Sequence, residues 1–223
     1  MTKVYREADL SAEFEQDFTW RIFEISSLKD AILDAAPKQQ AVLLRALVAI
    51  LYAHWEGHIK FIVEKYFQFI TIRKISLHLL ERQLHINHFI PRLAAIASSG
   101  AGVKQRSALL EDILFGGDYR FARIDKKLID TRSNLNSQVL EELCLVCGLD
   151  YSLLFKDHDD FIDRIVLKRR NEIAHGQDTP VGSEEIDTLV DNVLALMRSF
   201  RNGLENKIYN KEYLKAEGSV AGG

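Results

Sequence analysis

Helix-breaking residues are scarce in this chain, and their scarcity constrains the fold more than any other feature of the sequence. The 223 residues include only 3 Pro and 12 Gly. Leu, Ile, Ala, Glu, Lys and Arg, which favour helices, recur throughout. Hydrophobic residues make up 47% and charged residues 27%, so the chain can bury a core. The sequence therefore predicts an all-α fold without a convincing β-strand.

Two long amphipathic helices are predicted near the beginning of the chain. Apolar residues recur at spacings of three and four from Leu10 to Ala36, and we expect Pro37 to end this helix. A second helix of this kind is expected from about Gln39 to Ile70. Since the turn between them is short, they would form an antiparallel hairpin. We expect a helical bundle in which these long antiparallel N-terminal helices pack against the later helices.

The rest of the chain is also predicted to be helical. We assign residues 1–215 to a single domain, with a helical insertion at approximately residues 71–135 that Pro91 interrupts. Gly148 and Gly176 would stop two of the later helices in the left-handed conformation, and Ser183 would cap the last one. The small and polar residues 216–223 are expected to form a disordered tail. The later helices are predicted over residues 104–115, 137–147, 157–175 and 183–210.

Charge and hydropathy restrict the function classes. The formal net charge of −3 gives no global attraction to nucleic acid, so any RNA contact has to come from a local basic patch. The most apolar stretch, Leu43 to Tyr52, contains Arg45 and is too short for a membrane span. We therefore expect no membrane association.

The two cysteines, Cys144 and Cys147, have the CxxC spacing of a redox or zinc motif, but no second pair accompanies them. Two small apolar residues on a buried helix are the preferred interpretation. The chain has too few cysteines for a disulfide framework, and its N-terminus shows no signal-peptide pattern. We therefore expect a cytoplasmic protein.

The segment from Arg169 to Gly176 is the most informative part of the sequence. At about 100° per residue, four polar residues would form one line along a helix. This line comprises Arg164, Lys168, Asn171 and His175. Arg170 lies about 140° from His175 on an ideal helix, so the two share a site only if the long arginine reaches around or a dimer forms a cleft.

Arginine and histidine together match the needs of RNA cleavage by the 2′-hydroxyl group. An imidazole gives and takes protons near neutral pH, and a guanidinium holds phosphate oxygens in a bidentate grip. Cleavage requires a base for the 2′-hydroxyl and a cation for the charge that develops on the phosphorane. This chemistry needs neither a metal ion nor another cofactor.

Arg170 and Asn171, followed by three residues and His175 late in an all-helical chain, resemble the RNxxxH form of the signature motif of HEPN domains. From about Ser11 to Asn210 the chain resembles, more narrowly, HEPN-like nucleases of prokaryotic defence and toxin systems. The segments that carry this second resemblance are 51–60, 134–136 and 148–150. The resemblance implies an all-α HEPN-type bundle and a homodimer that juxtaposes two motifs. It further implies metal-independent cleavage of RNA that leaves a cyclic phosphate and a 5′-hydroxyl.

The resemblance implies that Arg170 binds the phosphate, that His175 transfers protons, and that Asn171 orients one of them or the RNA. Arg169 also satisfies a permitted spacing and could replace Arg170. An antitoxin or another defence-system protein is the expected partner that restrains the enzyme. The residues expected to support the site or bind RNA are Arg169, Lys168, Arg164, His54 and Glu56.

Two other functions remain open. The chain could be a non-catalytic HEPN subunit of a larger complex, used for dimerisation or for binding RNA or nucleotides, in which the basic helix end only complements the helix dipole. It could also be a zinc-dependent hydrolase, since His54 and His58 lie four residues apart on a predicted helix. The residues between them do not give the HExxH order of zinc proteases, however.

Overall fold

The computed structural model describes residues 5–216, and helices joined by turns and irregular loops make up this part of the chain. No strand occurs within that range, and its only β-type pairings are two isolated bridges, Ser76 with Arg120 and Leu80 with Leu214. The expected all-α class is confirmed. The predicted tail falls almost entirely on residues 217–223, which lie outside the described residues.

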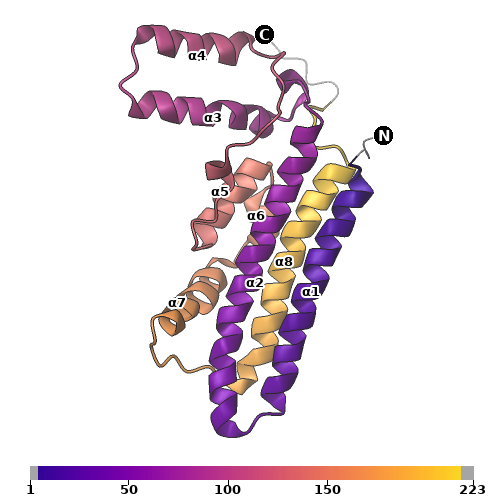
Figure 1. Cartoon of the computed structure of the whole chain (residues 1–223), viewed down its shortest axis with the longest axis vertical. Helices are drawn as coiled ribbons and strands as arrows, with labels where there is room; N and C mark the ends of the chain where they lie inside the picture. The colour runs from indigo at the N-terminus through magenta and orange to yellow at the C-terminus, as the bar shows by residue number, and fades with distance from the viewer. Residues whose placement is uncertain (1–4, 217–223) are drawn as a thin grey trace.

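Three long helices, α1 (Glu7–Leu33), α2 (Pro37–Ile72) and α8 (Ile186–Tyr209), run side by side and form the body of the molecule (Figure 1). The expectation that Pro37 ends the first helix was wrong. Helix α1 ends at Leu33, and Pro37 is the first residue of α2. Proline suits this position because the first turn of a helix does not use its N–H groups.

The core lies where the apolar faces of these three helices meet. Each helix contributes large side chains that are almost fully buried. Burying one such side chain stabilises the fold by about 1.5–3 kcal/mol, so this contact is the main source of stability. The central residues are Phe14, Phe18 and Ile25 on α1, Leu51, Trp55 and Ile59 on α2, and Val193, Met197 and Phe200 on α8.

A helical hairpin of α3 (Arg82–Ser98) and α4 (Val103–Phe115) projects from one end of the bundle (Figure 1). A short 3₁₀ turn, η1 (Leu77–Leu79), precedes it. Pro91 lies inside α3 and does not interrupt it, contrary to expectation. The buried side chains of Leu84 and Phe89 pack α3 against the core on the turns before Pro91, and this packing outweighs the backbone hydrogen bond that proline removes.

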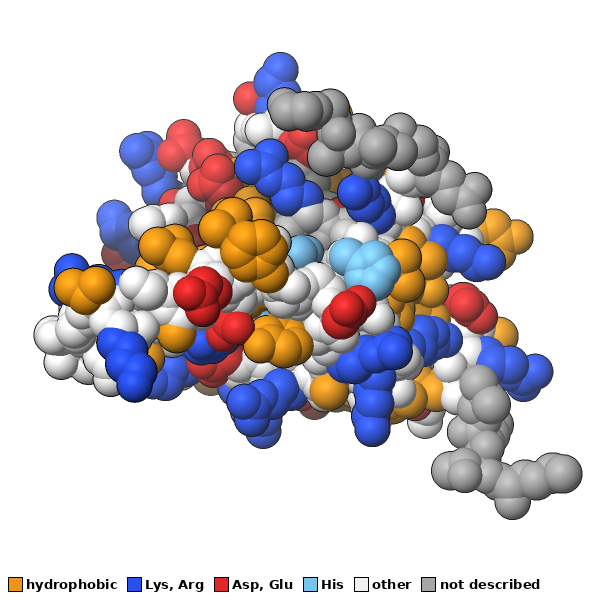
Figure 2. Space-filling view, turned by 90° about the horizontal axis from the view of Figure 1, so that it is seen from above, with side chains coloured by type: hydrophobic (Ala, Val, Ile, Leu, Met, Phe, Trp, Pro, Cys, Tyr) orange, Lys and Arg blue, Asp and Glu red, His pale blue; other side chains and the backbone are white. Residues whose placement is uncertain are grey.

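The outer helix of the hairpin leaves large apolar side chains exposed. Seen from the end of the molecule that carries the hairpin, apolar side chains lie uncovered among charged ones (Figure 2). The exposed large apolar residues of α4 are Val103, Leu110, Ile113, Leu114 and Phe115.

The remaining elements follow one another along the side of α2 (Figure 1). Two of the segments singled out in the sequence act as helix ends. Asn136 Oδ1 accepts a hydrogen bond from Val139 N at 2.7 Å at the start of α5, and Gly148 ends α5 in the left-handed conformation with φ of 70°. The elements are η2 (Lys126–Ile129), α5 (Ser137–Cys147), α6 (Tyr151–Phe155), η3 (Phe161–Lys168), α7 (Arg169–Ala174) and η4 (Ser183–Glu185).

The two cysteines are free thiols and are fully buried on α5. Burial raises the pKa of both thiols, so they remain protonated. The expectation that they are apolar packing residues is confirmed.

The start of the last helix differs from the prediction. Ser183 makes no capping hydrogen bond. Instead, the backbone N–H of Gly182 donates to Glu185 Oε1 at 3.1 Å across the 3₁₀ turn η4, and α8 begins at Ile186. The carboxylate of Glu185 therefore satisfies a backbone donor that precedes the turn, whereas a Ser183 cap would have accepted from N–H groups that follow it.

Among the described residues, no helix combines the length and the apolar character needed to cross a bilayer.

A buried hydrogen bond ties the loop before α5 to the middle of α2. The Tyr52 hydroxyl accepts from the backbone N–H of Leu135 at 2.7 Å, and both residues are almost fully buried. We predict that Tyr52→Phe lowers the free energy of unfolding by about 1–3 kcal/mol, because it leaves a buried N–H without a partner. Urea unfolding measures the change. Tyr209→Phe, at a tyrosine that is 83% exposed, is the matched control and should change little; equal stability of both variants would contradict the prediction.

Candidate active site on the helix from Phe161 to Ala174

The helix that carries the arginine–histidine motif contains a π-helical segment near its start. Residues Phe161–Lys168 form the π segment η3, and residues Arg169–Ala174 continue as the α-helix α7. Asp157, expected to be its first residue, has a positive φ of 67° and lies before it. π segments are rare and occur often at functional sites.

The wider turn of the π segment breaks the polar line predicted from an ideal helix. Its hydrogen bonds run from residue i to residue i+5, so 100° per residue was the wrong spacing for this stretch. Lys168, Asn171 and His175 do line one pocket, of about 340 Å³. Arg164 does not. It pairs with Asp160 at 3.2 Å on the exposed surface.

His175 directly follows α7 and is exposed to solvent. Its backbone N–H donates to Asn171 O at 3.0 Å, and Gly176, with φ of 77°, ends the helix in the predicted left-handed conformation. Within residues 5–216 the imidazole has no hydrogen-bond or ion-pair partner. Both ring nitrogens are therefore available to a ligand.

Arg170 faces a different pocket, of about 490 Å³, between α7 and α2. Its guanidinium lies over the Tyr52 ring, 4.4 Å from the centroid, and Nη1 donates to Asn171 Oδ1 at 2.6 Å. Burial and the nearby Glu56 carboxylate raise the pKa of Tyr52 to about 12, although the hydrogen bond from the Leu135 backbone and the charge of Arg170 oppose the rise. The ring therefore stays neutral beneath the cation, and the aromatic face and the amide hold the guanidinium in place.

Asn171 connects the two pockets. Its side chain accepts the hydrogen bond from Arg170, and the same residue lines the pocket that contains His175. Arg170 and His175, in contrast, do not line a common pocket of this single chain. The difficulty expected from helix geometry, that the two groups lie on different sides, is thus seen in the structure.

The other predicted basic residues have partners. Arg169 Nη1 donates to Glu185 Oε2 at 2.7 Å, so its guanidinium is directed to η4 and away from both pockets. The hydrogen bond from Arg169, with one from the Gly182 backbone, lowers the pKa of Glu185. Lys168 Nζ lies 3.9 Å from Glu172 Oε1. Arg170 is therefore better placed than Arg169 to bind a phosphate.

A comparison with known protein families bears on this motif. The family model described as RiboL-PSP-HEPN matches residues 16–206. This chain belongs to that HEPN family. The match includes Arg170, Asn171 and His175, and family membership indicates a HEPN-type nuclease or nucleotide-binding role. No curated protein and no solved structure matches the chain.

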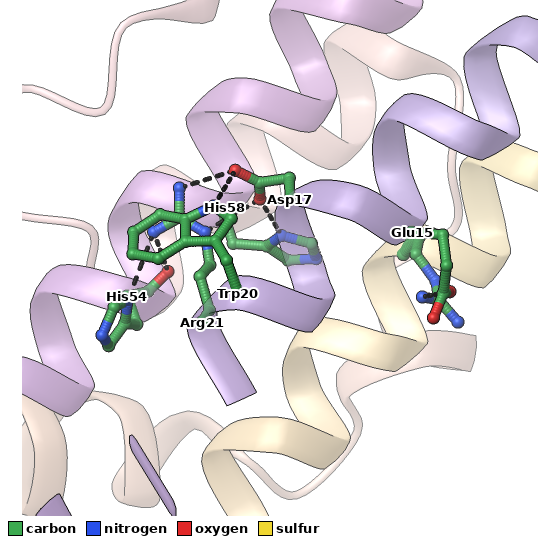
Figure 3. Close-up of polar contacts among 7 residues, drawn as sticks. Glu15, Asp17, Trp20, Arg21, His54 and His58 are labelled. Carbon is green, nitrogen blue, oxygen red and sulfur yellow. Dashed lines mark hydrogen bonds and ion pairs between the residues drawn. The ribbon is translucent and has the colours of Figure 1, made fainter. Parts of the chain in front are cut away.

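His54 does not lie beside the HEPN motif. It is 5% exposed and faces α1 from the opposite side of α2, where its Nδ1 lies 3.4 Å from Arg21 Nη1 (Figure 3). Its Nε2 lies 3.1 Å from Glu24 Oε2. Glu56, two residues later, lines the pocket that contains Arg170. These two residues, two positions apart on α2, thus lie on opposite faces of the helix.

A buried polar cluster joins α1 to α2 at this level (Figure 3). Arg21 donates twice to Asp17, at 2.8 and 3.0 Å, and His58 Nδ1 donates to Asp17 Oδ2 at 2.6 Å. Gly57 allows the close approach, because a Cβ atom there would lie 2.9 Å from Arg21 Nη1. The sequence offered one signal that we missed: Asp17 and Arg21 are four residues apart and so share one helix face.

The zinc-hydrolase alternative does not fit this arrangement. The Arg21 cation lies against His54 Nδ1, and His58 donates to Asp17, so a metal ion would have to displace both contacts. Among the described residues, no group of three or more His, Cys, Asp or Glu is arranged to hold a metal ion.

Glu56 was expected near the site, but sequence reasoning missed two other neighbours of Arg170 on α2, Tyr52 and Lys60. Lys60 lines the same pocket as Glu56 and Tyr52. These residues are spaced by four along the helix, so the helical period carried the signal.

The two buried histidines should make stability depend on pH. Burial lowers the pKa of both His54 and His58, and their acidic neighbours only partly offset it. On acidification the unfolded chain takes up protons near its usual histidine pKa of 6.5 before the folded chain does. We therefore predict that the free energy of unfolding is highest above that pH and falls as the pH drops below it.

Urea unfolding across this pH range measures the effect. His58→Gln should reduce the slope of stability against pH between about pH 6.5 and 5, whatever its effect on absolute stability. Asp17 adds its own loss only at lower pH: burial raises its pKa, but hydrogen bonds from His58 and Arg21 outweigh this and lower it. An unchanged slope in His58→Gln would show that this histidine is not the source.

Proposed function

We propose that the protein is a metal-independent endoribonuclease whose active site forms between two copies of the chain. The observation that carries the proposal is the state of the two motif side chains: the His175 imidazole is exposed and unpartnered within residues 5–216, while Arg170 is held in place by Asn171 and Tyr52. Cleavage by the RNA 2′-hydroxyl requires a free proton carrier and a positioned cation, and the chain supplies one of each in neighbouring pockets.

In the proposed reaction His175 accepts the proton of the 2′-hydroxyl as its oxygen attacks the adjacent phosphorus. The bond from phosphorus to the 5′-oxygen breaks, and that oxygen receives the proton that His175 took up, directly or through water, so that the imidazole returns to its neutral form. The products are a 2′,3′-cyclic phosphate and a 5′-hydroxyl. Arg170 stabilises the charge on the phosphorane, and Asn171 fixes Arg170 through the 2.6 Å hydrogen bond.

A two-fold dimer would solve the separation of the two groups. Arg170 and His175 of one chain line different pockets, whereas a second α7 placed across the first brings each arginine near the partner's histidine. We propose such a homodimer, acting as a toxin or defence effector, with an antitoxin or another partner protein that restrains it.

We predict that the purified protein cleaves single-stranded RNA in EDTA and that His175→Ala lowers kcat by at least about 100-fold, the usual contribution of a general base. Labelled RNA resolved on a gel measures this. The control is His78→Ala, which removes an imidazole near Gly117 at the distant end of the bundle and should leave the rate unchanged. Equal background cleavage by all three proteins would sink the proposal.

A mixing experiment tests whether the site is shared between chains. Neither Arg170→Ala nor His175→Ala should cleave alone. In a mixture that has exchanged subunits, half of the dimers are mixed and each keeps one intact site, so about a quarter of wild-type activity should return. No recovery in a mixture shown to contain mixed dimers would mean that each chain builds its own site.

The second candidate is a HEPN subunit that binds RNA or nucleotides without cutting them. The wide separation of Arg170 and His175 within one chain favours it. Wild-type protein that binds RNA in EDTA but leaves it intact would support this function.

A further inference from the structure

Three parts of the chain line the pocket beside Arg170. One face of α2 forms its floor, the turn from Asp130 to Ser133 forms one edge, and Arg170 forms another. Its volume is about 490 Å³, enough for part of an extended ligand. The α2 residues in the floor are Ala49, Tyr52, Ala53, Glu56, Gly57 and Lys60.

Two cations lie at opposite ends of this pocket. Arg170 lies over Tyr52, and Lys60 is two helical turns further along α2, about 12 Å along the axis. Lys60 is exposed, and no carboxylate among the described residues lies within ion-pair distance of its ammonium group. Each end of the pocket therefore presents a positive charge suited to an anionic group.

Oxygen atoms occupy the stretch between the cations. Glu56 Oε1 accepts from the Thr131 hydroxyl at 2.7 Å, and Thr131 is 2% exposed, so this contact fixes the carboxylate in the wall. Asp130 and Ser133 line the same edge. Carboxylates accept hydrogen bonds from amino and N–H groups, and a hydroxyl both donates and accepts.

The turn at the edge of the pocket is strained. Arg132 and Ser133 have positive φ values of 55° and 57°, and the N–H of Asn134 donates to Thr131 O at 3.2 Å, as in a type I′ turn. Glycine and asparagine are usual at these positions, and another residue costs roughly 1 kcal/mol or more. Strain of this kind collects at ligand-binding sites. Here it directs Ser133 to the pocket, while Arg132 pairs with Glu142 at 2.6 Å outside it.

We infer that this pocket is a subsite for a nucleoside phosphate, which in RNA is one nucleotide of a single strand. The phosphates on its two sides contact Arg170 and Lys60, and Glu56 and Ser133 contact the base and ribose between them. A polyanion with hydrogen-bonding groups between its charges matches this order of cation, oxygen atoms and cation. The assignment of RNA as the natural ligand rests on the proposed function, but binding in the pocket is separable from cleavage.

Binding to a strand that cannot be cut tests the subsite. The probe is a fluorescein-labelled 2′-O-methyl oligoribonucleotide in EDTA, and anisotropy gives Kd at several salt concentrations. Lys60→Ala should weaken binding about tenfold, as expected for a charge-assisted contact. It should also reduce the slope of log K against log salt by about 0.7, the value for one phosphate contact to a single strand.

Matched variants separate the subsite from general effects. Lys104→Ala removes an exposed lysine on α4 and should change neither Kd nor the salt slope. Glu56→Gln keeps an acceptor for Thr131 and should change the preference among the four homopolymers without changing the slope. Equal Kd and slope for wild type, Lys60→Ala and Lys104→Ala would overturn the inference.

The outcomes also distinguish this inference from the proposed function. Adding Lys60→Ala to the His175→Ala protein should weaken binding of the probe as much as it does in wild type. This result supports the subsite even if no protein cleaves RNA. Where cleavage occurs, Lys60→Ala should raise KM with little change in kcat, because Lys60 positions the strand. Competition by free AMP, GMP, CMP or UMP that is lost in Lys60→Ala would identify a free nucleotide as the ligand of the same subsite.

Discussion

Helix α2 is packed on two sides, and the rest of the structure depends on this double contact. On one side its apolar face closes the core with α1 and α8, where Leu51, Trp55 and Ile59 are buried. On the other side it supports α7 and the turn before α5 through Tyr52 and Glu56. Because a helix packed along its length is rigid, the short and weakly buried α7 takes its position from α2. The polar groups proposed to act on RNA are thus held by the same helix that completes the hydrophobic core.

The separation of Arg170 and His175 is a consequence of helix geometry. It affects the proposed chemistry because the two groups of one chain do not share a pocket. Five residues along a helix place two side chains on different sides, and here they open onto different pockets that Asn171 connects. A long arginine could have bridged this gap, but its contacts with Tyr52 and Asn171 hold it at α2. In a symmetric dimer, the Arg170 of one chain could lie near the His175 of the other while Arg170 keeps its contacts with Tyr52 and Asn171.

Local signals predicted the fold where a short stretch of residues decides the backbone. Helix α5 has its predicted bounds because Asn136 caps one end and Gly148 ends the other. Prediction failed where a residue has two roles or where the helix period changes. Pro37 begins a helix as readily as it ends one, and the π turn from Phe161 to Lys168 removed Arg164 from the predicted polar line. Lys168, Asn171 and His175 were placed together correctly, whereas His54 turned to α1 because Arg21 and Glu24, distant in sequence, form its surroundings.

Gly57 separates the pocket beside Arg170 from the buried Arg21 guanidinium by main-chain atoms alone. It lines the outward-facing pocket on one side of α2, and on the other side the Arg21 guanidinium occupies the space that a Cβ atom would need. A residue larger than glycine here would require the Arg21 guanidinium to shift, although two hydrogen bonds hold it to Asp17, so a substitution in the pocket floor would also disturb the buried cluster.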